Sequence, residues 1–357
     1  MNEVGAGFVA EKMVQWWVVP GPDGGVLERR LVDLPRPGES QAVVIVRAAG
    51  LNRGELFSRG PLRTGRPGAR GYPSGVEFAG EIVALGPGLN GWSVGDRVMG
   101  RAPASHAEYV VVPVDALIPV PAALTSTEAA AVPNVFVTAH DALVTTARIG
   151  PADRVLITAG SSGVGSAALQ IARYVGCRTV AATTRSTAKA DRLRVLGATA
   201  VIDTSEPGWA AEAVVEADTD TGGAFDVVID QVGGALFPAL LEVLAISGRY
   251  VTVGRNDGTT STIDLDVVAR KRLELIGVTF RTRTAAEALA CSKRFADQLL
   301  PAFETGQLAP VLDRTFPLEA LDAAFDYLAS DAQVGKVVVT TSCVNEVDPS
   351  SGAGLAT

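Results

Sequence analysis

Residues 154–177 read RVLITAGSSGVGSAALQIARYVGC and hold the clearest structural signal in the chain. An apolar strand leads into a glycine-rich turn, and a helical pattern follows it. Gly176 then supplies a helix stop. The helix keeps its apolar side chains on one face: Val164, Ala168, Ile171, Ala172 and Val175. This pattern predicts a strand, a tight turn and a helix in direct succession.

The turn has the chemistry to hold a pyrophosphate. Glycine has no Cβ, so backbone N–H groups and the positive end of the helix can approach an anion closely. The spacing is GxxGxG rather than GxGxxG, and taken alone it also fits a tight turn with no ligand. The cofactor-binding residues predicted here are Gly160, Ser161, Ser162, Gly163, Val164 and Gly165.

Outward from this unit, apolar strands alternate with helical patterns from about residue 126 to 283. The expected strands are 154–158, 179–183, 200–202, 225–230, 250–253 and 273–278. Strands joined by helical crossovers favour a parallel, doubly wound sheet, and the turn belongs to its first strand. That position supports the ligand-binding interpretation of the turn.

The end of the second strand predicts which nucleotide is bound. A site selective for NAD places Asp or Glu about 20 residues past the glycines, where it binds the ribose 2′-hydroxyl. Residues 183–189 contain neither. The hydroxyls and two cations there suit a 2′-phosphate, so NADPH is the predicted cofactor; they belong to Thr184, Arg185, Ser186 and Lys189. The alternative is that Ser186 caps a helix while Arg185 and Lys189 are solvated.

The two ends of the chain predict a second domain. Short β-rich runs such as QAVVIVRAAG and GEIVALG, separated by Gly/Pro turns, indicate a barrel-like domain over 1–125. We expect it to be completed by 284–343, with helices at 284–305 and 318–329 and strands near Val311 and at 336–340. Residues 126–283 form the nucleotide-binding domain, and the polar end 344–357 is expected to be disordered.

Composition excludes several classes of function. The 357 residues, 47% hydrophobic and 20% charged, are typical of a folded protein, and a net charge of −8 disfavours nucleic-acid and anionic-membrane partners. The start of the chain lacks the pattern of a signal peptide. Cysteines at 177, 291 and 343 contain no CxxC pair, which fits a reducing, cytoplasmic location without disulfides.

A series of segments, in order, resembles the zinc-independent branch of the medium-chain dehydrogenase/reductase superfamily, the quinone oxidoreductase and enoyl reductase group. The segments are AAGLNRGELFSRG (48–60), GVEFAGEIVALGPGLNGWSVGDRVMG (75–100), AEYVVVP (107–113), AAAVPNVFVTAHDAL (129–143), AGSSGVGSAALQIARYVG (159–176), DQVGG (230–234) and VGKVVV (334–339). The resemblance implies an α/β protein with a GroES-like β-barrel catalytic domain and a Rossmann domain with a doubly wound parallel sheet.

The resemblance also implies the site residues. Asn52 would lie beside the nicotinamide as a catalytic residue. Arg53 is unusual for this family, and it is a second catalytic candidate because it flanks Asn52 near the expected substrate cleft. Thr138 would touch the cofactor, and Lys336 would reach it near the cleft between the domains. The residues expected to line the nicotinamide half are Gln231, Val232 and Gly254.

Some of these roles have alternatives. Asn52 could donate to a developing oxyanion or brace its loop. Arg53 and Glu55 could select a charged substrate or pair with each other. Phe57 stands where quinone reductase relatives often have a tyrosine, so it offers no proton. His106 and His140 are interpreted as structural.

No metal site is predicted. Zinc-dependent relatives carry Cys at the position of Asn52, His at that of Val76 and a further Cys near Asn134 or Val135. Amide and aliphatic side chains are not zinc ligands. Glu77 is interpreted as structural.

The resemblance implies NADPH-dependent reduction of α,β-unsaturated carbonyl compounds or quinones, with a small-molecule substrate. Carbonyl reduction and non-catalytic NADPH binding in the same fold are the alternatives. A homodimer is expected, because the apolar strand LELIGVTF (273–280) would otherwise leave an open sheet edge.

Overall fold

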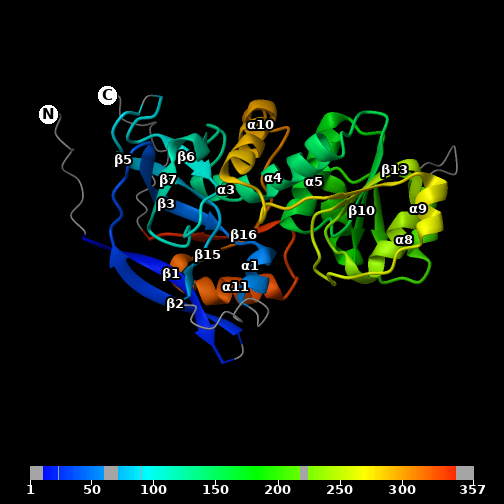
Figure 1. The fold of residues 1–357 in the computed structure, drawn as a ribbon, viewed down its shortest axis with the longest axis horizontal. Helices are drawn as coiled ribbons and strands as arrows, with labels where there is room; N and C mark the ends of the chain where they lie inside the picture. Colours follow the sequence, from blue (N-terminus) through cyan, green and yellow to red (C-terminus); the bar gives the residue numbers. More distant parts are fainter. Residues whose placement is uncertain (1–10, 23, 60–70, 90, 218–223, 343–357) are drawn as a thin grey trace, which may run out of the picture.

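The computed structural model describes residues 11–22, 24–59, 71–89, 91–217 and 224–342, with the side chains of 57–59 left out. Figure 1 shows two lobes side by side. We call them the first lobe, which contains both ends of the described chain, and the second lobe, which contains the middle. The tail 344–357 and the residue Cys343 lie outside the described residues.

The second lobe is built on a parallel sheet of six strands in the order β11-β10-β9-β12-β13-β14. The bounds are β9 Arg154–Ile157, β10 Thr179–Thr184, β11 Ala200–Asp203, β12 Phe225–Asp230, β13 Leu244–Thr252 and β14 Glu274–Gly277. All six predicted strands are confirmed, although β13 begins earlier than residue 250. The order is that of a doubly wound sheet whose switch point lies between β9 and β12.

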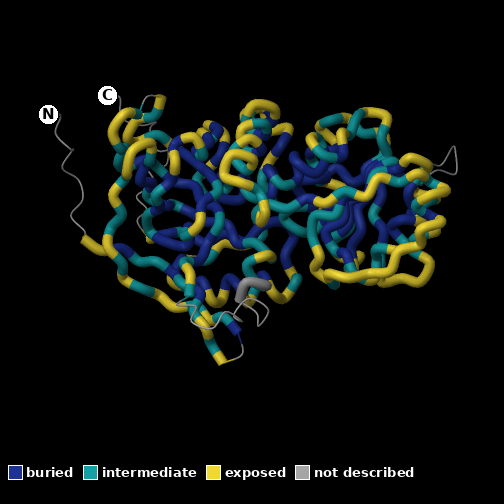
Figure 2. The backbone as a smooth tube through the Cα atoms, in the orientation of Figure 1, coloured by how far each residue is buried: buried dark blue, intermediate teal, exposed yellow. Residues whose placement is uncertain are grey.

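Helices cover both faces of this sheet. They are α5 Gly163–Val175, α6 Ala190–Val195, α7 Trp209–Ala217, α8 Phe237–Glu242 and α9 Leu265–Lys271, with short 3-10 turns at Thr187–Lys189 and Gly234–Leu236. Val155 and Ile157 belong to one hydrophobic core, and Leu156 belongs to the core on the opposite face. This alternation explains the continuous apolar strands, which Figure 2 shows as the buried interior of the lobe.

In the part of the first lobe that the structure describes, the strands form two sheets. The smaller joins β2 Gly24–Asp33, β1 Lys12–Gly21 and β4 Tyr72–Pro73. The larger runs β15-β16-β3-β5-β6-β8, with β7 also paired to β3. Its bounds are β3 Gln41–Gly50, β5 Phe78–Leu85, β6 Arg97–Gly100, β7 Tyr109–Pro113, β8 Leu117–Pro119, β15 Leu312–Pro317 and β16 Lys336–Thr340.

The C-terminal segment returns to the first lobe. β16 pairs antiparallel with β3, so a strand from the end of the chain lies beside one from its beginning. The strand expected near Val311 is β15, and the expected helices are α10 Ala285–Glu304 and α11 Leu321–Ala329. Thr284 begins α10 with a capping box closed by Glu287, which accounts for its clear sequence signal.

Short helices complete the first lobe and connect the lobes. They are α1 Arg53–Arg59, α3 Ser126–Ala129 and α4 Pro133–His140, with a π-helical turn Asp141–Thr146 and 3-10 turns Val114–Ala116 and Leu318–Ala320. Side chains of α4, α5 and α10 share one hydrophobic core, so α4 packs between the two lobes. None of the helices in the described residues has the length and apolar character needed to cross a bilayer.

Candidate functional site

The glycine turn lies at the carboxyl end of β9, beside the switch point of the sheet. Ser162 caps α5: its Oγ accepts a hydrogen bond from the Gly165 N–H at 3.0 Å and donates to Gln231 Oε1 at 2.8 Å. Residues 161–164 are partly exposed, whereas the helix is buried from Gly165 to Leu169. Because the first N–H groups of a helix have no acceptor within it, this exposed turn can receive an anion.

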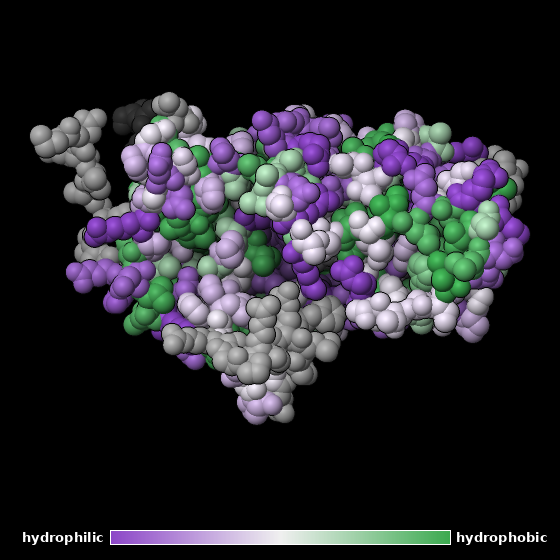
Figure 3. Space-filling model, viewed as in Figure 1, coloured by the Kyte–Doolittle hydropathy of each residue, from purple (hydrophilic) through white to green (hydrophobic). Residues whose placement is uncertain are grey.

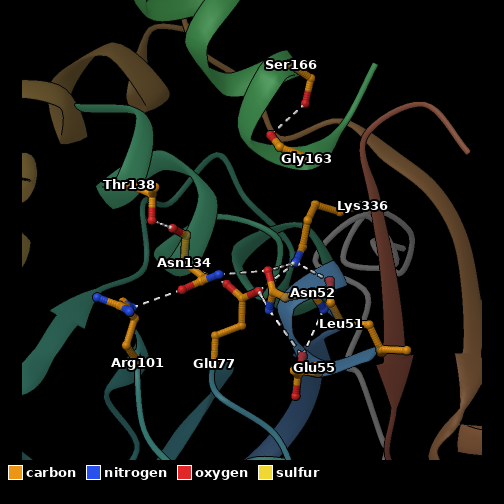
Figure 4. A network of polar contacts seen from close by, with 10 residues as sticks. All are labelled: Leu51, Asn52, Glu55, Glu77, Arg101, Asn134, Thr138, Gly163, Ser166 and Lys336. Carbon is orange, nitrogen blue, oxygen red and sulfur yellow. Dashed lines mark hydrogen bonds and ion pairs between the residues drawn. The ribbon is translucent and has the colours of Figure 1, made fainter. Parts of the chain in front are cut away.

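Close packing explains the glycines. A Cβ on Gly165 would lie 2.3 Å from the Ala159 carbonyl oxygen, and one on Gly160 would lie 2.8 Å from the Ala182 Cβ. A Cβ on Gly163 would lie 2.9 Å from Cδ of Lys336. The contact between Gly163 and Lys336 joins the two lobes, because Lys336 begins β16 of the first lobe. Figure 4 shows Lys336 directly beside the start of α5.

The three residues expected at the nicotinamide half lie together beside the turn. Gln231 donates from its backbone to Thr158 Oγ1 at 2.8 Å and from Nε2 to the Thr158 carbonyl at 2.9 Å. A Cβ on Gly254 would lie 2.2 Å from the Gln231 carbonyl oxygen, so only glycine fits there. Val232 follows Gln231 and donates its N–H to Asp230 Oδ1 at 2.9 Å.

Below the turn, two buried charges form an ion pair. Lys336 is 3% exposed and Glu77 is fully buried. The Lys336 ammonium donates to Glu77 Oε1 at 2.7 Å, to Asn52 Oδ1 at 2.9 Å and to the Leu51 carbonyl at 2.5 Å. These contacts use all three of its donors. A buried ion pair is stable only when its partners are well hydrogen-bonded, and this pair meets that condition.

Asn52 lies at the centre of this network (Figure 4). Its Nδ2 donates to Glu77 Oε1 at 2.8 Å and makes a longer contact of 3.4 Å to Glu55 Oε2. Its Oδ1 accepts from Lys336 and from Asn134 Nδ2 at 2.8 Å. Both amide N–H bonds therefore point to protein carboxylates. Of the two roles open from the sequence, this geometry favours bracing over donation to a substrate.

Glu55, considered from the sequence as a substrate-selecting residue or a partner of Arg53, instead braces the start of α1. Its carboxylate accepts the Asn52 backbone N–H at 2.8 Å, which closes the start of α1. Burial raises the pKa of Glu55 from 4.5 to about 7, while Lys336 and the Asn52 hydrogen bonds oppose the shift. An Asn followed three residues later by Glu is a capping signal, and this signal could have identified the role of Glu55 at the start of α1.

Arg53 does not pair with Glu55, so that alternative is wrong. Its guanidinium forms an ion pair with Asp331, in the segment between α11 and β16. Arg53 therefore faces the junction of the lobes, next to the residues expected at the 2′-phosphate. The side chain of Phe57 lies outside the described residues.

Asn134 and Thr138 lie one turn apart on α4, and both are partly exposed. The Asn134 backbone N–H donates to Glu77 Oε2 at 2.7 Å, and its side-chain oxygen accepts from Arg101 Nε at 3.1 Å. The Thr138 hydroxyl donates to the Asn134 carbonyl at 2.6 Å. The network thus extends from α1 through Glu77 to the face of α4 where Thr138 was predicted to meet the cofactor (Figure 4).

The residues predicted at the 2′-phosphate gather at the end of β10. Arg185 is largely exposed and pairs with Asp331 Oδ2 at 3.1 Å. The Lys189 ammonium donates to the carbonyl oxygens of Asp331 and Gln333, at 2.6 and 3.0 Å. Lys189 is therefore not simply solvated, as one alternative required.

The hydroxyls of this segment have local roles. The Ser186 side chain makes no capping hydrogen bond to the turn Thr187–Lys189, so the alternative in which it caps a helix is wrong. Its backbone N–H instead donates to Thr184 Oγ1 at 3.1 Å. Thr184 is buried and shapes the turn that presents Arg185.

The positions of the zinc ligands hold a different arrangement. Asn52 and Asn134 bond to each other, and the Lys336 ammonium already sits between Asn52 and Glu77. A fixed cation among these oxygens repels a second cation, and amides are poor zinc ligands, so the residues do not fit a zinc ion. Across the described ranges, no group of three or more His, Cys, Asp or Glu is placed to hold a metal.

Both histidines are buried in the packing. His106 Nδ1 lies 2.8 Å from Ser74 Oγ, its ring meets Phe325 edge-on, and burial lowers its pKa to about 3. His140 Nε2 lies 2.7 Å from Gln298 Oε1. These contacts support the structural interpretation.

Two family models match the chain. An alcohol dehydrogenase GroES-like domain covers residues 38–122, and a zinc-binding dehydrogenase domain covers residues 196–339. The first spans most of the large sheet of the first lobe, and the second spans the later strands of the second lobe together with the returning C-terminal segment.

Many curated proteins are similar to the chain. The spectinabilin polyketide synthase system protein NorB of Streptomyces orinoci is 34% identical over 336 residues, which is 91% of this chain but 14% of that protein. The chain thus spans a small part of this much longer relative. The quinone oxidoreductase-like protein 2 homolog of Nematostella vectensis is 29% identical over 308 residues, 85% of this chain and 82% of that protein.

Solved structures of several proteins are also similar to the chain. An alcohol dehydrogenase superfamily protein from Novosphingobium aromaticivorans is 31% identical, with a TM-score of 0.80, and 92% of this chain covers 99% of that one. The JamJ enoyl reductase is 28% identical, with the same TM-score and coverage. A mycobacterial protein, Rv1454c, solved with NADPH, is 27% identical with a TM-score of 0.81 and the same coverage.

Proposed function

The chain belongs to the medium-chain dehydrogenase/reductase superfamily, and from this premise we propose that it is an NADPH-dependent, zinc-independent reductase of C=C bonds conjugated to a carbonyl. One observation carries the proposal. Lys336 joins the glycine turn to Asn52 and Glu77, so the turn and a buried polar network meet at one place between the lobes. The similarity to enoyl reductases supports the reaction class.

The residues present fit NADPH. The exposed start of α5 would hold the pyrophosphate, Arg185 and Lys189 would hold the 2′-phosphate, and Gln231 with Gly254 would line the nicotinamide half. When bound, NADPH supplies the hydride for reduction. A charged hydrogen bond to the 2′-phosphate contributes about 1.5–3 kcal/mol, a preference for NADPH over NADH of roughly 10- to 150-fold.

The protein's own contribution is positioning. Lys336, Glu77 and Asn134 all hydrogen-bond to the Asn52 side-chain amide and hold it in place. The start of α1 and the face of α4 with Thr138 are thereby fixed relative to the turn. Polar groups held rigidly at these two helices would orient a substrate without reorganising during the reaction.

Ketone and aldehyde reduction is less well supported. Reduction of an isolated carbonyl benefits from a group that polarises its oxygen. Lys336 cannot do so in this arrangement, because its three donors are directed at protein oxygens. Quinones remain a second candidate substrate class, since a quinone oxidoreductase-like protein matches most of the chain.

A substrate panel tests the proposal. Purified protein is given NADPH with an enone, an enoyl thioester, a quinone or a ketone, and absorbance reports NADPH oxidation while fluorescence reports NADPH binding. We expect turnover with the enone or the enoyl thioester. NADPH binding without turnover of any compound would indicate a non-catalytic NADPH-binding protein instead.

Three further features belong to the proposal. The catalytic domain comprises 1–125 and 284–343, the nucleotide domain comprises 126–283, and the location is cytoplasmic.

The protein is a homodimer, because β14 is an edge strand and Leu275 and Ile246 are exposed near it. Figure 3 shows hydrophobic side chains gathered over the part of this lobe where α8 and α9 lie. Light scattering at micromolar concentration tests the dimer, and a monomer would contradict it.

A further inference from the structure

Asp331 connects the two lobes at the predicted 2′-phosphate site. It lies between α11 and β16, and its carboxylate pairs with Arg53 of the first lobe. The same carboxylate pairs with Arg185 of the second lobe at 3.1 Å. Its backbone carbonyl accepts a hydrogen bond from Lys189 at 2.6 Å. Three cations from two lobes thus converge on one acidic residue.

This cluster holds more positively charged side chains than negatively charged ones. Both Arg53 and Arg185 pair with the one Asp331 carboxylate. Burial, and then the nearby Arg185, lower the pKa of Arg53. The pKa of Lys189 is lowered mainly by burial, with Arg192, Arg185 and Arg53 contributing to the shift, although Asp313 opposes it. The cations Arg53, Arg185, Lys189 and Arg192 outnumber the two carboxylates beside them, Asp331 and Asp313, so the cluster keeps excess positive charge. A phosphate dianion is the ligand class that such a cluster favours.

We propose that Asp331 is a specificity-determining residue that competes with the 2′-phosphate of NADPH for Arg185. This inference rests on the proposed NADPH site. NADH has no 2′-phosphate and leaves the Arg185–Asp331 ion pair in place. NADPH must draw Arg185 away from Asp331 and place its phosphate close to a carboxylate. Asp331 therefore weakens binding of NADPH and leaves binding of NADH almost unchanged.

The exposure of the pair sets the size of the effect. The side chains of Arg185 and Asp331 are 77% and 41% exposed. Exposed ion pairs contribute little to stability, so Arg185 can leave Asp331 readily. Like-charge repulsion across a partly exposed site is screened by water, and we expect it to weaken NADPH binding by about tenfold.

The variant Asp331→Asn tests this competition. Asp331 has a φ of +60°, a backbone conformation that Asn adopts as well as Asp, so the substitution removes the charge without straining the loop. Dissociation constants for NADPH and NADH are measured by cofactor fluorescence on the full chain. We expect about tenfold tighter NADPH binding and less than a twofold change for NADH. Asp326→Asn, an exposed position on α11, is the control for net charge.

Arg185→Ala separates this inference from the proposed cofactor. If Arg185→Ala removes the preference for NADPH and Asp331→Asn leaves both constants as they are, the role of Asp331 is wrong and the NADPH site stands. If the wild type binds the two cofactors equally and Arg185→Ala changes nothing, both proposals are wrong. Equal tightening by Asp326→Asn would also overturn the competition, because net charge alone would then explain it.

Discussion

Lys336 Nζ lies 2.7 Å from Glu77 Oε1 in the interior of the protein, where both side chains are almost completely buried. The two residues are 259 positions apart in the sequence. Lys336 also packs against Gly163 at the start of α5, so this ion pair links the nucleotide-binding turn to the first lobe. The pair fixes the relative position of the two halves of the site.

Lys336→Met is expected to destabilise the protein by about 3–5 kcal/mol, because it leaves the Glu77 charge buried without its partner. The double variant Lys336→Met/Glu77→Gln should lose much less free energy of unfolding than the sum of the losses in the two single variants. Urea unfolding measures both. The control is Lys12→Met, which removes an exposed ion pair with Asp33 and is expected to cost less than about 1 kcal/mol. Strictly additive losses for the buried pair would contradict this account.

The buried ion pair between Lys336 and Glu77 could not be predicted from sequence patterns, whereas much of the fold could. Alternating strands and helices predicted the six-stranded sheet, since each element leaves a local periodicity. The sequence predicts that the C-terminal segment returns to the first lobe, but not that β16 pairs with β3. The partner of Lys336 depends on how distant strands pack, and Lys189 binds backbone carbonyls, which leave no mark in the sequence.

Glu55 gives the stability a pH dependence. Because burial raises its pKa to about 7, the folded protein keeps a proton that the unfolded chain releases near pH 4.5. The stabilisation from that proton is complete below about pH 4.5 and is lost as the pH rises through 7. We therefore expect the free energy of unfolding of the wild type, relative to Glu55→Gln, to fall from about pH 5 to pH 8. Glu216→Gln, at an exposed site on α7, is the control. Parallel profiles for the wild type and Glu55→Gln would refute the assignment.

Asn52→Ala separates bracing from catalysis. The change removes partners from Lys336, Glu77 and Asn134, so we expect a lower melting temperature and a loss of about 1–3 kcal/mol for each polar group left unpaired. Turnover of the folded variant should fall far less than the 100- to 1,000-fold typical of a lost oxyanion donor. Turnover, NADPH affinity and thermal unfolding are measured together. A normal melting temperature with turnover reduced about 1,000-fold would make Asn52 a catalytic donor.

Zinc content tests the replacement of the metal by an ammonium group. Because Lys336 occupies the space between Asn52 and Glu77, we expect no stoichiometric zinc in the purified protein and full activity in a chelator. Metal analysis by mass spectrometry gives the stoichiometry. One zinc per chain, lost together with activity, would show that the metal displaces the network.

The position of the transferred hydride tests the proposed function most directly. NADPH carrying deuterium at the transferable C4 position is incubated with the protein and an enone, and the product is examined by NMR. Conjugate reduction predicts deuterium on the β-carbon of a saturated ketone. Deuterium on the carbonyl carbon of an alcohol, or the absence of label from every product, would contradict it.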